Sequence, residues 1–249
     1  MSLRDQVVLI TGASRGIGRA IADRAAAEGA RLVLCARSAE PLREAARELS
    51  KTAEVVAIPT DASRENEVER LRDEAIVRFG RVDAVVNNAG TAESAPFLKT
   101  ERAFWDRMIA ENATSAFLVS RAFIGGMVER KSGRIVMVAS VSGKQGAPYV
   151  AAYAASKHAM LGLMRSLAAE FGPKGVRVNA VCPGYVDTPM TDKNVKNVVA
   201  KTGKSQGEAR KAMEEMNPQK RFLKADEVAA AVLPLLDSSC SKNGEAIDL

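Results

Sequence analysis

A serine, a tyrosine and a lysine are the residues of this chain whose types and spacing best suit proton chemistry. Tyr153 and Lys157 are four residues apart in a helical pattern, so one helix face would carry both side chains, one turn apart. A free phenol has a pKa near ~10, and a neighbouring ammonium group stabilises the phenolate. We therefore expect Tyr153 to act as a general acid or base near neutral pH on a carbonyl or an alcohol. Ser140, which ends an apolar run upstream, would orient the substrate oxygen.

This pair alone is weak evidence, because a tyrosine and a lysine four residues apart on a helix are often a solvated face. A second motif strengthens it. The segment Thr11–Gly18 contains three glycines between an apolar run and a helical pattern. Such glycines allow a tight turn and let backbone N–H groups approach a pyrophosphate at the helix N-terminus. A purely structural turn can use the same glycines, but the position after the first strand favours a dinucleotide.

Two later segments fit the same cleft. Asn87–Gly90 ends the fourth apolar run with small residues that would let a ribose lie close. Asp61 follows the third run and has two equally weighted interpretations: its carboxylate accepts a hydrogen bond from an adenine amino group, or it caps the helix that starts after Ser63.

The second strand ends without the acid that accepts both ribose hydroxyls of NAD in dinucleotide-binding folds. Its end is followed by Arg37, and Arg15 lies in the glycine loop. Two guanidinium groups would suit the 2′-phosphate of NADP. The alternative is that Arg37 caps the strand or pairs with Glu40, while Arg15 is solvated. We expect NADP(H) to be preferred.

The elements that must position these residues are strand-length apolar runs alternating with helical patterns. This order predicts a single-domain α/β fold covering residues 1–249, a Rossmann-type doubly wound parallel sheet with helices on both faces. Four glycines, Gly29, Gly80, Gly133 and Gly172, are expected to end helices in the left-handed conformation. The predicted strands are Val7–Thr11, Arg31–Ala36, Glu54–Thr60, Val82–Ala89, Arg134–Ser140, Val176–Pro183 and Glu245–Leu249.

Composition narrows the class further. The chain has 249 residues, 47% of them hydrophobic, enough for one large core. Its three cysteines are far apart and its only histidine is isolated, so we expect reduced thiols and no metal site. Neither a signal peptide nor an apolar run long enough for a membrane span is visible, and we expect a cytoplasmic protein without membrane contact.

The net charge is +6, and most of it lies late in the chain. Residues 191–224 contain nine Lys or Arg and four acidic residues. We expect residues 188–221, which are polar and long for a connection, to form a substrate lid that Met190, Met213 and Met216 help to repack. Some of the lid lysines Lys193, Lys196, Lys201 and Lys204, with Arg130 and Lys174, would attract a phosphate-bearing carrier. The alternative is that these lysines belong to a solvated surface loop. Nucleic acid binding is disfavoured, because no aromatic residues are interleaved with these charges.

Taken together, these motifs resemble the successive motifs of the short-chain dehydrogenase/reductase family, in order and over nearly the whole chain. The matching positions are Thr11–Gly18, Asn87–Gly90, Asn112, Ser140, Tyr153, Lys157 and Asn179–Thr188. The resemblance implies a catalytic tetrad of Asn112, Ser140, Tyr153 and Lys157, in which Asn112 supports a water chain to Lys157. It also implies a cofactor site of Gly12, Ser14, Arg15, Gly16, Ile17, Gly18, Arg37, Asp61, Asn88, Ala89, Gly90, Tyr153, Lys157, Pro183, Gly184 and Thr188.

Within that family the motifs are most like those of 3-oxoacyl-thioester reductases, acting on acyl-carrier-protein or coenzyme A substrates in fatty acid metabolism. The implied partners are a small-molecule or carrier-linked carbonyl substrate and further copies of the chain, as a dimer or tetramer. A ketoreductase or alcohol dehydrogenase for another small or polyketide-like substrate is the alternative. A non-catalytic dinucleotide-binding protein is disfavoured, because a pure binder needs no Ser140, Tyr153 or Lys157 at working spacing.

Overall fold

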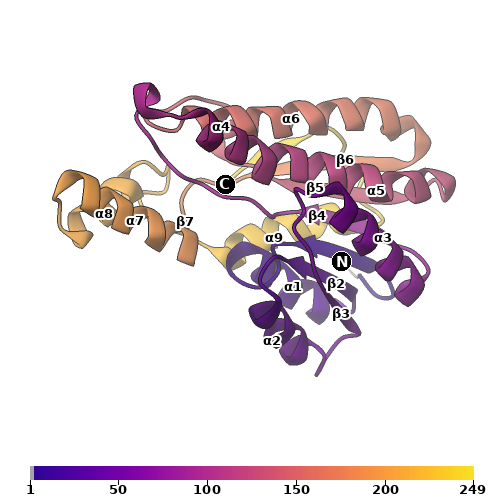
Figure 1. The fold of residues 1–249 in the computed structure, drawn as a ribbon. Coiled ribbons are helices and arrows are strands. Elements are labelled where there is room, and N and C mark those ends of the chain that lie inside the picture. Colours follow the sequence, from indigo (N-terminus) through magenta and orange to yellow (C-terminus); the bar gives the residue numbers. More distant parts are fainter. Residues whose placement is uncertain (1–2) are drawn as a thin grey trace.

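The computed structural model describes residues 3–249, and these form a central parallel sheet with helices on both faces (Figure 1). The strands are β1 (Val7–Thr11), β2 (Arg31–Ala36), β3 (Val55–Pro59), β4 (Ala84–Asn87), β5 (Gly133–Val138), β6 (Val176–Cys182) and β9 (Ala246–Asp248), with the short β7 (Val186–Asp187) and β8 (Leu223–Lys224) apart. The long helices are α1 (Gly16–Ala27), α2 (Ala39–Leu49), α3 (Glu65–Phe79), α4 (Arg102–Ile109), α5 (Ser115–Glu129), α6 (Ala151–Phe171), α7 (Pro189–Thr202), α8 (Gln206–Glu215) and α9 (Ala225–Leu236).

The seven strands follow the order β3-β2-β1-β4-β5-β6-β9, and every neighbouring pair is parallel. The chain winds outward from β1 through β2 to β3 and then returns to place β4 on the other side of β1. This reversal creates a switch point at the carboxyl ends of β1 and β4, which is where open α/β sheets bind ligands. The predicted fold class is confirmed, and all seven predicted strands are present, shorter by one or two residues at some ends, with β5 beginning one residue earlier than predicted.

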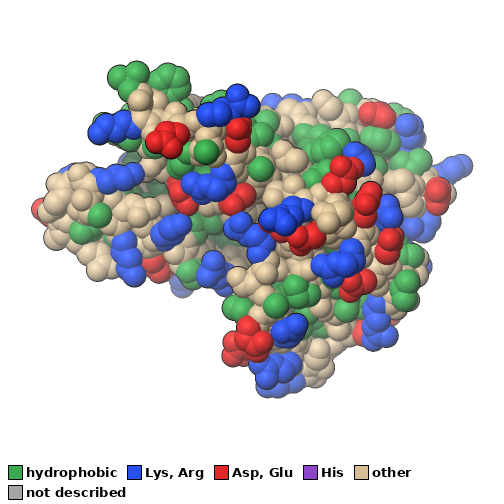
Figure 2. Space-filling model, viewed as in Figure 1, with side chains coloured by type: hydrophobic (Ala, Val, Ile, Leu, Met, Phe, Trp, Pro, Cys, Tyr) green, Lys and Arg blue, Asp and Glu red, His purple; other side chains and the backbone are tan. Residues whose placement is uncertain are grey.

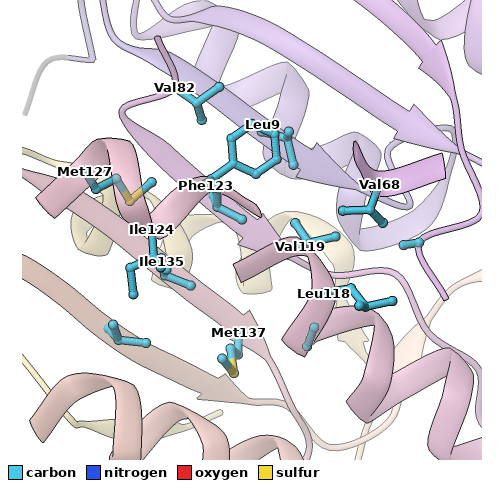
Figure 3. Close-up of a cluster of buried hydrophobic side chains, with 14 of the residues drawn as sticks. Leu9, Val68, Val82, Leu118, Val119, Phe123, Ile124, Met127, Ile135 and Met137 are labelled. Atoms are coloured by element: carbon cyan, nitrogen blue, oxygen red, sulfur yellow. The ribbon is translucent and has the colours of Figure 1, made fainter. Parts of the chain in front are cut away.

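Alternating residues of the buried strands build two cores. In β1, Val7 and Leu9 pack on the face covered by α3, α5 and α6, whereas Val8 and Ile10 pack on the face covered by α1, α2 and α9. Figure 3 shows the first core, where Leu9 meets side chains of α5 such as Phe123. Because both faces of β1 are buried, the sequence of this strand is apolar throughout.

Two of the four glycine predictions are wrong. Gly29 and Gly80 have positive φ angles of 84° and 77° and end their helices as expected. Gly133 instead begins β5, where a Cβ would collide with Met127, and the left-handed residue of that turn is Lys131. Gly172 continues from α6 into a 3₁₀ turn.

The region expected to be a polar lid contains α7 and α8, which project from one end of the sheet (Figure 1). These two helices were not predicted from the sequence. Signals for both are present: Pro189 occupies the first turn of α7, and Ser205 and Glu208 form a capping box at α8. A small cluster that includes Val195, Met213 and Phe222 packs the lid.

No helix within residues 3–249 is long and apolar enough to cross a membrane. In the same residues no group of three or more His, Cys, Asp or Glu side chains is placed to hold a metal ion.

Candidate functional site

The ends of β1 and β4 are tied together at the switch point. The Thr11 hydroxyl accepts hydrogen bonds from the backbone N–H groups of Asn88 (2.9 Å) and Ala89 (2.8 Å), and donates one to the carbonyl of Val86. The Asn88 amide donates to the carbonyl of Thr11 at 2.8 Å. These bonds fix the small residues that follow β4 directly beside the glycine loop.

The glycine loop is shaped for a close ligand. Gly12 and Gly16 have φ angles of 66° and 59°, which side chains rarely tolerate, and a Cβ on Gly18 would collide with the carbonyl of Gly12. The loop leads into α1 at Gly16, with Ile17 next to it packing partly against the core and Ser14 half-buried just before it.

The start of α1 is suited to bind an anion. Among the described residues no side chain caps this helix, and its first turn carries no acid. The first N–H groups of a helix have no partner within the helix. The residues present therefore fit the pyrophosphate of a dinucleotide, which such a helix end stabilises.

The structure removes one of the two interpretations of Asp61. Helix α3 begins at Glu65 after Arg64, so Asp61 does not cap it. Its carboxylate accepts hydrogen bonds from the backbone N–H (3.0 Å) and hydroxyl (2.7 Å) of Ser63. Burial would raise the pKa of Asp61, but these bonds and the charges of Arg37 and Arg64 hold it below its usual value. Asp61 stays ionised beside the cleft, where it can accept a hydrogen bond.

The two arginines expected at the cofactor differ in their surroundings. Arg15 is exposed, and no ion pair forms on it within residues 3–249. The Arg37 guanidinium donates to Glu111 at 2.8 Å. The alternative pairing of Arg37 with Glu40 is wrong, because Glu40 lies beside the arginines of its own helix α2.

Asn112 lies in a π-helical turn, Ala110–Thr114, between α4 and α5. It is fully buried, and its carboxamide accepts a hydrogen bond from the N–H of Thr91 and donates to the Thr91 carbonyl and the Ser156 hydroxyl, each at 3.0 Å. A Cβ on Gly90 would collide with the Asn112 oxygen. The turn therefore sets Asn112 between the end of β4 and the helix α6.

Tyr153 and Lys157 lie one turn apart on α6, as expected from their spacing. The Lys157 ammonium is 5.9 Å from the centre of the Tyr153 ring and donates to the carbonyl of Val138 at 3.0 Å. Ser140 follows β5, is buried, and its hydroxyl accepts from the N–H of Ser142. A hydrogen bond joins Ser140 to the Tyr153 phenol.

The protonation of this pair differs from the expectation. Burial raises the pKa of Tyr153 to about 12, although the bond from Ser140 opposes the rise. Burial also lowers the pKa of Lys157 to about 8. The expected lowering of the Tyr153 pKa by Lys157 is therefore not found in the protein alone, because the ammonium is directed at Val138 and loses hydration itself. Tyr153 carries its proton at neutral pH.

The residues expected at the nicotinamide lie in the loop after β6. Pro183 accepts a hydrogen bond from the N–H of Val141, which ties this loop to the residue after Ser140. Thr188 precedes α7, and its side chain would lie 3.5 Å from a Cβ on Gly16, so the two segments face each other. Gly184 follows Pro183 and lies closely against Asn217.

Asn217 is a site residue that sequence analysis missed. It is buried, its oxygen accepts from the N–H of Tyr185 at 2.7 Å, and its amide donates to the carbonyls of Tyr185 and Arg221. The Asn217-Pro218 dipeptide was a visible turn signal. Asn217 holds the loop at Gly184 through contacts with a residue 32 positions away. The local turn signal does not predict such a contact.

Glu93 is a second missed residue. It forms ion pairs of 3.1 Å with both Arg107 on α4 and Lys193 on α7. Lys201 donates to the carbonyl of Ser94 at 2.9 Å. The lid helix α7 is thus joined to the segment after β4. Figure 2 shows Lys and Arg side chains over the lid, at the left of the view, with fewer acidic ones.

Known proteins resemble this chain in both sequence and fold. The sequence profile described as short chain dehydrogenase matches residues 6–199. Levodione reductase of Leifsonia aquatica is 39% identical over 244 residues, covering 95% of this chain and 89% of that protein. The 3-oxoacyl-(acyl-carrier-protein) reductase of Escherichia coli is 36% identical over 193 residues, 77% of this chain and 78% of that one. A crystal structure of an actinorhodin polyketide ketoreductase variant with NADPH has a TM-score of 0.94 at 35% identity, and covers 100% of this chain and 97% of that one.

Proposed function

Because the chain belongs to the short chain dehydrogenase family and is an oxidoreductase of that family, we propose that it interconverts a carbonyl and a secondary alcohol with NADP(H). The observation that carries the proposal is the convergence of Ser140, Tyr153 and Lys157 on one side of a switch point whose other side is an anion-binding glycine loop. A dinucleotide-binding protein without chemistry would not need that convergence.

We propose that the cofactor lies between the glycine loop and the Thr188 loop. Its pyrophosphate would lie at the start of α1, Asn88, Ala89 and Gly90 would line the ribose, and Asp61 would face the adenine. Lys157 would hold the nicotinamide ribose, and Pro183, Gly184 and Thr188 would contact the nicotinamide. When bound there, the nicotinamide supplies or accepts the hydride.

The residues of the chain handle the proton and the geometry. The Ser140 hydroxyl donates a hydrogen bond to the substrate oxygen, which orients the carbonyl carbon. Tyr153 holds its proton at neutral pH, with a pKa of about 12, and gives it to that oxygen during reduction. Lys157, with a pKa of about 8, carries a second proton one helical turn away. Asn112 anchors the segment that would carry water toward Lys157.

For the substrate we propose a 3-oxoacyl thioester, because relatives of this chain include 3-oxoacyl-(acyl-carrier-protein) reductases over most of its length. A free ketone is the second candidate, favoured by the similarity to levodione reductase, whose crystal structure has a TM-score of 0.94 at 36% identity. The lid formed by residues 188–221 would close over either substrate. Among its lysines, Lys193 and Lys201 are engaged with the segment after β4, so a carrier would meet them only when the lid opens.

We further propose a cytoplasmic homo-oligomer acting in fatty acid metabolism, without membrane or nucleic acid partners, in which all residues form one domain. Exposed aromatic side chains on α4 and α5, Trp105 and Phe117, support contacts between copies, because such residues favour interfaces. Light scattering on the purified protein would check the oligomer.

The test is a substrate panel of 3-oxoacyl thioesters, cyclic and open-chain ketones and secondary alcohols, each followed by nicotinamide absorbance with NADPH and with NADH. We expect reduction with NADPH and the highest kcat/KM on a thioester. Turnover of ketones alone would favour the second candidate. Absence of turnover across the panel, or equal or better efficiency with NADH, would contradict the proposal.

A further inference from the structure

Arg37 follows β2 at the carboxyl edge of the sheet and forms an ion pair with Glu111. Its Nη1 donates to Glu111 Oε1 at 2.8 Å, and its charge also helps to lower the pKa of Asp61. The Arg37 side chain is 59% exposed, whereas that of Glu111 is only 16% exposed. The guanidinium is therefore reachable from solvent, but its partner is held by the protein.

Glu111 cannot easily move away from this position. It belongs to the π-helical turn Ala110–Thr114, immediately before Asn112, and the Asn112 carboxamide fixes that turn through its bonds to Thr91 and Ser156. The backbone carbonyl of Glu111 also accepts a hydrogen bond from Ser115 at 2.8 Å. The backbone that carries the Glu111 side chain is thus fixed, and its largely buried carboxylate lies against Arg37.

The other cations at this edge are not equivalent. Arg64 lies 3.6 Å from Asp61 and 3.8 Å from Glu67. Arg15, in contrast, forms no ion pair within the described part of the chain and precedes the uncapped start of α1. Of the two arginines expected at the adenosine ribose, Arg15 is therefore the one whose guanidinium forms no ion pair within residues 3–249.

We propose that Glu111 is a specificity-determining residue, whose carboxylate competes with the 2′-phosphate of NADP(H) for the Arg37 guanidinium and so reduces the preference for NADP(H) over NAD(H). This inference rests on the proposed function. A phosphate that binds Arg37 must share a guanidinium already donating to a carboxylate, and charge-assisted bonds of this kind are strong. Cofactors without the 2′-phosphate do not meet this competition.

The direct test replaces Glu111 with glutamine. The Glu111→Gln side chain keeps an oxygen that accepts from Arg37 but loses the charge. Calorimetric titration with 2′,5′-ADP, which carries the phosphate, and with 5′-AMP, which lacks it there, measures binding without catalysis. We expect 2′,5′-ADP to bind about tenfold tighter to the variant, equivalent to ~1.4 kcal/mol, and 5′-AMP to change less than about twofold. Unchanged or weaker binding of 2′,5′-ADP would overturn the inference.

A double-mutant cycle with Arg37→Ala shows whether the effect passes through Arg37. If Glu111 competes for that guanidinium, Glu111→Gln has no effect in the Arg37→Ala background. An equal gain in that background would overturn the competition. Glu40→Gln is the matched control, since Glu40 is near Arg37 in sequence but pairs with Arg43 and Arg47, and it should leave both titrations unchanged.

The same titrations separate the inference from the function on which it rests. A parent protein that binds 2′,5′-ADP no better than 5′-AMP would contradict the proposed use of NADP(H), and the inference with it. A parent that prefers 2′,5′-ADP, with a Glu111→Gln variant that gains nothing, would leave the proposed function in place and overturn the role of Glu111 alone.

Discussion

Lys157 in the proposed catalytic cluster donates to the backbone carbonyl of Val138 and is 5% exposed, whereas Lys193 on α7 reaches Glu93 with 64% of its side chain exposed. Breaking a buried hydrogen bond leaves an unsatisfied group and costs ~1–3 kcal/mol, while an exposed ion pair contributes ~0.2–1 kcal/mol. The proposed catalytic residues are therefore held in one arrangement, and the proposed lid is held by contacts that thermal motion can open. A site that must be both accurate and accessible needs both kinds of attachment.

The largest effect should come from the catalytic cluster. Tyr153→Phe removes only the hydroxyl that carries the proton, so we expect kcat to fall about 10³-fold, within the ~10²–10⁴ range for general acid catalysis. Cofactor affinity should change little. Steady-state kinetics and a cofactor titration would measure both, with Tyr149→Phe at an exposed position as the control. Residual activity within about tenfold of the parent would show that Tyr153 is not the proton donor.

The burial of Lys157 predicts a pH-dependent stability. Its pKa is about 8 in the folded protein and 10.5 when unperturbed, so the unfolded chain binds more protons between these values and this cost of folding declines as pH rises. Lys157→Met removes that cost. The variant's advantage in unfolding free energy should therefore shrink by about 2 kcal/mol between about pH 7.5 and 9.5. Urea unfolding at several pH values would measure it, and equal shrinkage in the exposed Lys211→Met would contradict the assignment.

Asn112 should contribute to both stability and catalysis. Asn112→Ala removes the carboxamide that bonds to both Thr91 backbone groups and donates to the Ser156 hydroxyl, so we expect a loss of about 2 kcal/mol in unfolding free energy together with at least tenfold lower kcat. Asn179→Ala is the matched control, because that buried carboxamide also bonds to backbone groups, at Lys242 and Glu245. If both variants lose stability and activity alike, Asn112 has only a structural role.

The same division explains what could be predicted from the sequence. The strands, the glycine loop and the Tyr153–Lys157 face depend on local periodicity, and they were predicted correctly. The partner of Arg37 was not, because Glu111 is 74 residues away and only the folded sheet brings the two together. Likewise the pKa of Tyr153 depends on burial rather than on its spacing from Lys157. The lid helices had local signals at Pro189 and Ser205. Their apolar faces are short, and the many charged residues around them made the segment resemble a polar loop.

The smallest expected effect is that of the lid contact. Lys193→Met removes the pair with Glu93 while leaving Glu93 its partner Arg107, so the lid loses one attachment and keeps Lys201 on Ser94. At up to ~1 kcal/mol for such a pair, the lid should open up to about fivefold more often. Hydrogen exchange over α7 should accelerate by that factor at low ionic strength, and high salt should remove the difference because it screens the pair in the parent. KM should rise by a similar factor, because closure contributes to substrate binding, while kcat stays near that of the parent.

Lys196→Met changes a lysine of the same helix that forms no ion pair within residues 3–249, and it should match the parent in both measurements. If Lys196→Met accelerates exchange as much as Lys193→Met, the lid responds to loss of helix charge in general, and the contact with Glu93 does not control its opening.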